Sequence, residues 1–188
     1  MRCNTDRRTR RTGLTFPRYS IFVSEARPLE ITIRPALSRD AEGIARAYFE
    51  SAKYHAAMDP ERYSVPALET ILARYREGQQ HSTVGGQGIT VVAEFDGEVV
   101  GFIDAGLDQS PDLMHREITY CHVAEIAVSL RHQNQGIGGL LLQAAEDWGR
   151  EKGAEFASLE FHNENRSAGL FYQKRGYRPA SITAIKPL

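Results

Sequence analysis

The chain has 188 residues, of which 41% are hydrophobic and 25% are charged. A chain of this length and balance can form one domain with a proper hydrophobic core. Its apolar runs are only a few residues long, far short of the roughly 18 residues that a transmembrane helix needs. We therefore expect a globular protein that does not associate with membranes.

The formal net charge is −1, but it is unevenly distributed. Residues 1–30 hold seven arginines against three acidic residues, so the remainder of the chain is mildly acidic. An acidic body argues against a nucleic-acid-binding domain, for which a basic face is expected. Through electrostatic steering it favours amine-bearing substrates.

The two cysteines do not suggest a disulfide framework, because Cys3 lies in a polar tail and Cys121 in a predicted buried strand. We therefore expect a reducing, cytoplasmic environment. A lone thiol beside Val123 is expected to be part of the core rather than a nucleophile.

Residues 1–29 are predicted to form a basic, disordered N-terminal tail, and residues 30–188 a single catalytic domain. The tail lacks apolar periodicity, and its Arg and Thr content is also compatible with an organelle transit peptide.

The domain begins with an alternating strand at 31–34, followed by a helix that carries Ile44, Tyr48 and His55 on one face. A second helix is expected from about residue 66 to 78. Residues 90–95 and 98–103 flank Asp96-Gly97, the pair that favours a two-residue hairpin turn.

The second half of the domain continues with a strand over 118–128 and a helix that starts at about residue 138 and stops at Gly153. A strand over 156–161, a helix over 167–175 and a terminal hairpin or strand pair over 177–186 complete it. The predicted fold is an α/β domain with the order β-α-α-β-β-β-α-β-α-β-β.

A glycine-rich turn, residues 133–139, separates the strand ending at Val128 from the helix that follows. Such a turn directs backbone N–H groups and the positive end of a helix dipole at one point, a geometry that binds phosphate. A generic strand-to-helix turn remains the alternative. The dinucleotide fingerprint is excluded because its third glycine position holds Leu141, and the triphosphate loop because Leu140 stands where it needs lysine.

The turn resembles the Q/R-x-x-G-x-G/A loop of the GNAT acetyltransferase superfamily, matched by Gln133, Gly136 and Gly138. Residues 165–177 resemble that superfamily's N-x-x-A-x-x-x-Y-x-x-x-G-F/Y segment. Two motifs in this order, separated by one helix and one strand, identify a member of the superfamily over roughly residues 31–188.

The resemblance implies the GNAT fold, a mixed and mostly antiparallel sheet splayed between its fourth and fifth strands. It implies acetyl-CoA as the acetyl donor, with its pantetheine arm between the strand of 126–128 and that of 159–161, and no metal. The expected cofactor-binding residues are Ile126, Ala127, Val128, Gln133, Asn134, Gln135, Gly136, Ile137, Gly138, Gly139 and Asn165.

The same resemblance places a general acid at Tyr172, although a core position on an amphipathic helix is the competing interpretation. The base is either His122 or Glu125, predicted on opposite faces of one strand. Glu160 is a weaker candidate, and ordered water could replace a dedicated base. Either residue could instead be structural. A backbone N–H near Ile126 or Val128 is expected to stabilise the oxyanion.

We therefore expect an N-acetyltransferase that moves the acetyl group to a primary amine of a small molecule or peptide, by direct transfer in a ternary complex. The protein is expected to be a monomer or homodimer with no nucleic-acid partner. The alternative is a non-catalytic CoA-binding regulatory module. Acceptor recognition is expected near Tyr48, His55, Met58, Tyr63 and the loop over residues 108–117, the regions that recognise the acceptor in the superfamily.

Overall fold

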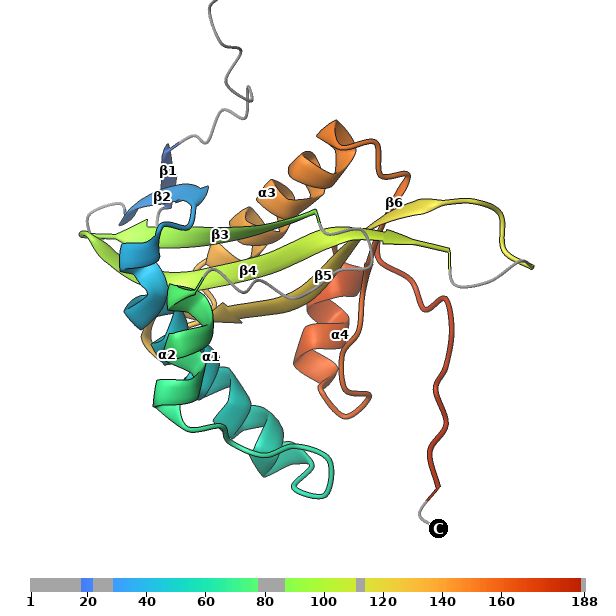
Figure 1. Ribbon diagram of the computed structural model, residues 1–188, viewed down its shortest axis with the longest axis horizontal. Coiled ribbons are helices and arrows are strands. Elements are labelled where there is room, and N and C mark those ends of the chain that lie inside the picture. The colour runs from blue at the N-terminus through green and yellow to red at the C-terminus, as the bar shows by residue number, and fades with distance from the viewer. Residues whose placement is uncertain (1–17, 22–28, 78–86, 111–113, 187–188) are drawn as a thin grey trace, which may run out of the picture. The chain divides into compact units, whose positions relative to one another are not determined.

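The structure, a computed structural model, describes residues 18–21, 29–77, 87–110 and 114–186 (Figure 1). It divides into two compact units, residues 1–158 and residues 159–188, and each is described by itself. The predicted disorder of residues 1–17 and 22–28 lies outside the described residues.

The first unit contains a sheet with the strand order β1-β2-β3-β4-β5-β6, whose last strand reaches the boundary between the units. The strands are β1 (Arg18–Ile21), β2 (Leu29–Pro35), β3 (Gly88–Phe95), β4 (Glu98–Gln109), β5 (Thr119–Val128) and β6 (Phe156–Leu159). The helices of this unit are α1 (Ala41–Met58), α2 (Leu68–Arg76) and α3 (Ile137–Glu151), with short 3₁₀ turns η1 (Ser38–Asp40) and η2 (Leu130–His132). The pairs β1–β2, β2–β3, β3–β4 and β4–β5 are antiparallel.

The predicted order of elements from the strand at 31–34 to the helix at 167–175 is confirmed. The tail prediction is wrong at Arg18–Ile21, which pairs with β2 as an additional edge strand. The predicted hairpin is confirmed, because β3 and β4 meet at Asp96 and Gly97, whose φ angles of 49° and 80° give the left-handed turn that matches strand twist.

Helices cover both faces of the sheet, with α1 and α2 on one face and α3 on the other (Figure 1). Phe102 of β4 and Ala127 of β5 form a buried core with Ile44 of α1 and Tyr75 of α2. On the opposite face, Cys121 Sγ lies 3.4 Å from the carbonyl oxygen of Ala145 in α3. Phe102 and Ala127 therefore mark the α1 face of the sheet, and Cys121 marks the α3 face.

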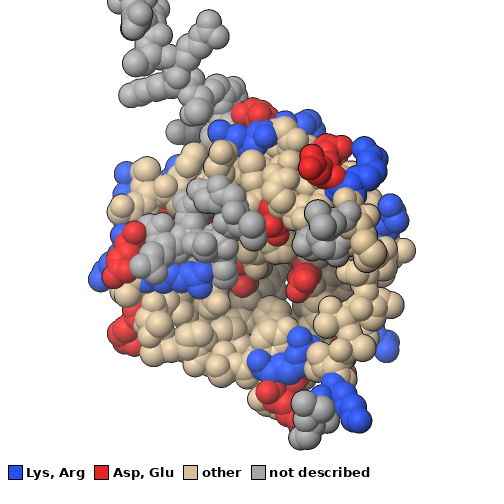
Figure 2. All heavy atoms as spheres, turned by 45° about the vertical axis from the view of Figure 1, so that its right-hand side comes forward, with Lys and Arg blue, Asp and Glu red and all other residues tan. Residues whose placement is uncertain are grey.

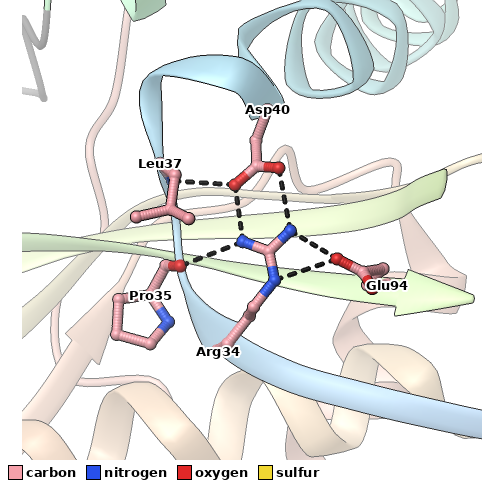
Figure 3. Close-up of polar contacts among 5 residues, drawn as sticks. All are labelled: Arg34, Pro35, Leu37, Asp40 and Glu94. Atoms are coloured by element: carbon pink, nitrogen blue, oxygen red, sulfur yellow. Dashed lines mark hydrogen bonds and ion pairs between the residues drawn. The ribbon is translucent and has the colours of Figure 1, made fainter. Parts of the chain in front are cut away.

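An ion network joins β2, η1 and β3 near the start of α1 (Figure 3). Two nitrogens of Arg34 donate to the two oxygens of Asp40 at 2.6 and 2.8 Å, and the same guanidinium also contacts Glu94. The Asp40 carboxylate accepts from the N–H of Leu37 as well, at 2.7 Å. Asp40 is only 5% exposed, and burial alone would raise its pKa. The hydrogen bonds from Arg34 and Leu37 outweigh burial and hold the pKa of Asp40 below its usual range.

The second unit contains α4 (Arg166–Gln173), whose N-cap is Asn165. The side-chain oxygen of Asn165 accepts from the N–H of Ala168 at 3.1 Å, a standard N-cap bond. The predicted strand pair over 177–186 is wrong, since no strand or helix forms there. Its β-branched residues favour strands only where a neighbouring strand supplies ladder hydrogen bonds.

Candidate functional site

The turn after β5 has a defined backbone conformation. It leaves Val128 through η2 and enters α3 at Gly136, whose φ of 84° lies in the left-handed region, as does the φ of 60° at Asn134. The side-chain amide of Gln133 donates to the carbonyl oxygen of Val128 at 3.0 Å, and Ser129 Oγ lies 2.8 Å from His132 Nδ1. These bonds close the turn on itself.

The turn presents a row of unused donors. Within the described part of the chain, the backbone N–H groups from Gln133 to Gly138 donate to no protein acceptor. The first of them lie in the turn and the last at the positive end of α3, where helix geometry leaves N–H groups without an intrahelical partner. A Cβ added at Gly136 would meet nothing within 4 Å, so the backbone there is open to approach. The residues present therefore fit a pyrophosphate group.

Gln135 adds an unsatisfied acceptor beside these donors. Its amide nitrogen donates to the carbonyl oxygen of Arg131 at 3.3 Å. Its Oε1 is buried and has no hydrogen-bond partner among the described residues. A buried amide oxygen left unpaired costs free energy, which a donor on a bound group would recover.

The turn is also tied to α1, a connection that the sequence did not indicate. The N–H of Leu130 donates to Glu50 Oε2 at 2.8 Å, across 80 positions of the chain. Contacts of this sequence separation cannot be predicted from periodicity, which reports only local structure.

A β-bulge in β5 determines where the two candidate bases point. Asp104 of β4 pairs with Glu125, but the next residue, Ala105, pairs with Val123, so Ala124 is the extra residue. A bulge reverses the alternation of side chains along a strand. His122 pairs with Gly106, and both Gly106 and Asp104 belong to the series on β4 that contains Phe102.

The prediction that His122 and Glu125 lie on opposite faces is therefore wrong. Directly opposed residues of an antiparallel pair point to the same side, so both side chains lie on the α1 face. Ile126, which a strand without a bulge would place on the same face as His122, pairs with Ile103 on the α3 face. The predicted alternation holds only up to the bulge.

Glu125 lies in a protected environment. Ser51 Oγ of α1 donates to its Oε1 at 3.3 Å. The pKa of Glu125 is raised to about 7, chiefly by burial and in addition by the nearby charge of Asp104, while Ser51 and Arg74 act in the opposite direction. A carboxyl group with this pKa can exchange a proton near neutral pH.

The other candidate bases are placed differently. His122 Nδ1 lies 3.1 Å from Ser158 Oγ of β6, so one ring nitrogen has a partner. In the same part of the sheet, the N–H of Glu155 donates to the carbonyl oxygen of Thr119 at 2.9 Å. β5 continues beyond His122 to Val128, whereas β6 ends at Leu159.

Glu160, the weaker candidate, follows the last residue of β6 and is exposed.

Cys121 is confirmed as a core residue. It is 2% exposed, and burial raises the pKa of its thiol to about 11. A thiol with this pKa is protonated at neutral pH and is a poor nucleophile.

In the second unit, Tyr172 is the buried residue of α4. Its ring packs against those of Phe161, Phe171 and Tyr177, with centroids 5.1 to 5.7 Å apart. Asn165, expected at the cofactor, uses its side-chain oxygen to cap α4. The motif residues of this segment thus have structural roles in addition to those that the resemblance implies.

The expected acceptor region contains an aromatic group at the end of α1. The ring of His55 lies 5.8 Å from that of Tyr54 and 5.4 Å from that of Tyr63. Its Nδ1 lies 2.9 Å from the carbonyl oxygen of Ser51, one helical turn earlier. Ser51 thus connects this group to Glu125.

Charged side chains of both signs are interspersed on the face shown in Figure 2. Among the described helices, none combines the length and the apolar character needed to cross a bilayer.

Comparison with known proteins gives a consistent result. The sequence model of the Acetyltransferase (GNAT) family matches residues 46–177, which span parts of both units. The chain is 25% identical over 147 residues to the uncharacterized N-acetyltransferase YhfO of Bacillus subtilis, covering 78% of this chain and 89% of that protein.

Solved structures show the same fold. A mutant of the BH1408 protein from Bacillus halodurans superposes with a TM-score of 0.74 at 20% identity, covering 83% of this chain and 98% of that one. The aminoglycoside N-acetyltransferase AAC(6')-Iy in complex with CoA gives a TM-score of 0.62 at 18% identity, covering 89% and 99%. At these identities the likeness establishes the architecture.

Proposed function

The chain belongs to the GNAT acetyltransferase family, and on that premise we propose that it transfers the acetyl group of acetyl-CoA to a primary amine of a small molecule or peptide. As a member of this family it is an acyltransferase, and the GNAT fold and the N-acetyltransferase names of its relatives agree with this. The donor, the acceptor class and direct transfer in a ternary complex are our proposals.

One observation carries the proposal of the donor. The turn from Gln133 to Gly138 offers consecutive N–H groups without protein acceptors, and a Cβ at Gly136 would meet open space. Pyrophosphate is the part of acetyl-CoA that such a turn would bind. The relative solved with CoA supports the same choice of donor.

In the proposed reaction, Glu125 accepts a proton from the acceptor ammonium, which gives the neutral amine that attacks the thioester carbonyl. Its pKa of about 7 lets the carboxylate form near neutral pH while it keeps enough basicity to act. Ser51 orients the carboxylate through its 3.3 Å hydrogen bond. A backbone N–H of β5 near Ile126 or Val128 stabilises the carbonyl oxygen as it gains charge.

Tyr172 is proposed as the general acid that gives its hydroxyl proton to the departing sulfur, and the proton that the attacking nitrogen loses as the amide forms restores the phenol. The motif resemblance supports this role, and the surrounding rings of Phe161, Phe171 and Tyr177 would hold the phenol in one orientation. The remaining proposed cofactor-binding residues are those of the turn, the end of β5 and Asn165.

The acceptor is proposed to be an amine because Glu125, the proposed base, contacts α1, whose end carries His55 and its aromatic neighbours. The solved N-acetyltransferase acts, as its name states, on aminoglycosides. That name guides the choice of compounds for a screen and leaves this chain's own acceptor to be measured.

The test is a screen of an amine panel with acetyl-CoA, in which release of free thiol and acetylated product are measured together. The panel should contain aminoglycosides, polyamines, amino acids and peptides with free N-termini. We expect thiol release that depends on one acceptor class. Tight binding of acetyl-CoA with no product from any amine would instead support a regulatory module. Stabilisation of the protein by NAD or ATP but not by acetyl-CoA would contradict the proposed donor.

A further inference from the structure

A second carboxylate, Asp104, lies directly across from Glu125 on the same face of the sheet. It stands in the middle of β4 and is 1% exposed, although it is ionisable. The bulge at Ala124 produces this pairing, because it turns Glu125 to the α1 face beside Asp104. Side chains directly opposed in an antiparallel pair have Cβ atoms about 4.5–5.5 Å apart.

Two hydroxyl groups hold Asp104 in place. Tyr75 of α2 donates to its Oδ2 at 2.8 Å, and Thr90 of β3 donates to its Oδ1 at 2.6 Å. Each carboxylate oxygen thus accepts a hydrogen bond from a neutral donor. This pattern suits an ionised carboxylate, which can only accept, and it fixes the group from two different elements.

The electrostatic surroundings of Glu125 come from several elements. β4 supplies Asp104, α1 supplies the hydroxyl groups of Ser51 and Tyr48, α2 supplies Arg74, and β5 itself supplies His122 on the same face. Of these, Asp104 is the neighbouring anion. A like charge close to a carboxyl group disfavours its ionisation, and Asp104 acts together with burial in this direction.

Asp104 itself is poorly placed to meet a substrate, because it is enclosed and both of its oxygens are engaged. A polar group of this kind in the core would serve stability better as an apolar residue, since burying a carboxylate is costly. Its position opposite Glu125 gives it a different use.

We propose that Asp104 is a positioning residue whose buried charge, fixed by Tyr75 and Thr90, sets the pH at which Glu125 becomes available as a base. The catalytic consequence rests on the proposed function, but the interaction between the two carboxylates does not. Tyr75 and Thr90 matter because they keep the charge on Asp104 and hold it opposite Glu125.

The first experiment is a carboxyl ¹³C NMR titration of Glu125 in the ligand-free protein, comparing the wild type with Asp104→Asn. The substitution removes the charge and keeps the shape. We expect the Glu125 midpoint to fall by about one pH unit. The control is Glu98→Gln, which removes an exposed charge from the same strand and should leave the midpoint unchanged. An unchanged midpoint in Asp104→Asn overturns the proposal.

A second measurement needs no variant and protects the test against a variant that fails to fold. In the wild-type protein, the Asp104 carboxyl carbon should have the chemical shift of an ionised group from pH 5 to pH 9, with a small inflection at the Glu125 midpoint. A neutral Asp104 over this range overturns the proposal.

The rate measurement connects the interaction with catalysis. If Glu125 is the base, the acid limb of kcat/KM in Asp104→Asn should move down by the same interval as the NMR midpoint. A shifted NMR midpoint in a protein that transfers no acetyl group would support the inference and contradict the proposed function. An active enzyme with an unshifted Glu125 midpoint and an unshifted acid limb would support the proposed function and overturn the inference.

Discussion

The backbone N–H of Leu130 donates to a carboxylate oxygen of Glu50 at 2.8 Å, and the next residue of α1, Ser51, donates to Glu125. One helical turn of α1 therefore contacts both the segment between β5 and α3 and the proposed base, Glu125. A shift of α1 on acceptor binding would change its contacts with both Leu130 and Glu125.

We predict that Glu50→Ala raises KM for acetyl-CoA by about three- to tenfold with little change in kcat. The substitution leaves the Leu130 N–H without its acceptor and loosens the entry to the turn, an effect of about 1 kcal/mol. Glu50→Gln keeps an acceptor oxygen and should restore most of the affinity. Steady-state kinetics at saturating acceptor would measure this split. A fall in kcat alone would contradict the expected role.

The conformation of the turn can be tested with a matched pair of glycines. Gly136 and Gly97 have φ angles of 84° and 80°, and at neither would a Cβ meet an atom within 4 Å. Alanine at either position should thus cost roughly 1–2 kcal/mol through the left-handed backbone alone. We expect similar losses in thermal stability, whereas acetyl-CoA binding should weaken only in Gly136→Ala. Equal affinities in the two variants would exclude the turn as the donor site.

The turn and the hairpin could be predicted because their geometry depends on local chemistry. Glycine is favoured wherever φ is positive, and Asp96-Gly97 and Gly136 both occupy such positions. The element order from β2 to α4 could be predicted because apolar periodicity is also local.

The faces of β5 beyond residue 123 could not be predicted. No glycine or other local signal marks the bulge at Ala124, which arises from the pairing of β4 with β5. The contact of Ser51 with Glu125 spans 74 positions and depends on how α1 packs on the sheet. The strand pair predicted over 177–186 failed for a related reason, because β-propensity reports a preference that only a partner strand can fulfil.

Tyr172 offers the test of the proposed general acid. Tyr172→Phe keeps the ring that packs against Phe161 and Phe171 and removes only the hydroxyl. We predict a fall in kcat of about 10² or more with acetyl-CoA affinity nearly unchanged. The control is Tyr177→Phe, which changes a neighbouring ring in the same way and should alter kcat by less than about threefold. Full activity of Tyr172→Phe on a good acceptor would remove this residue from the mechanism.

Glu125 connects activity with stability. Its pKa of about 7 is raised above the ordinary value of 4.5. Between these values the folded protein binds more protons than the unfolded chain, so this group makes the free energy of unfolding fall as pH rises from about 4.5 to 7. At pH 8 the folded protein then carries a penalty on the order of 3 kcal/mol from this one carboxylate.

We therefore predict that Glu125→Gln, a neutral substitution of similar shape, lowers kcat/KM by about 10²-fold or more and abolishes its rise through pH 7. The same variant should unfold at a higher temperature than the wild type at pH 8 and at nearly the same temperature at pH 4.5. Thermal melts across this range, paired with pH–rate profiles, measure both effects. A residual rate that still rises through pH 7 would contradict the role of Glu125 as the base.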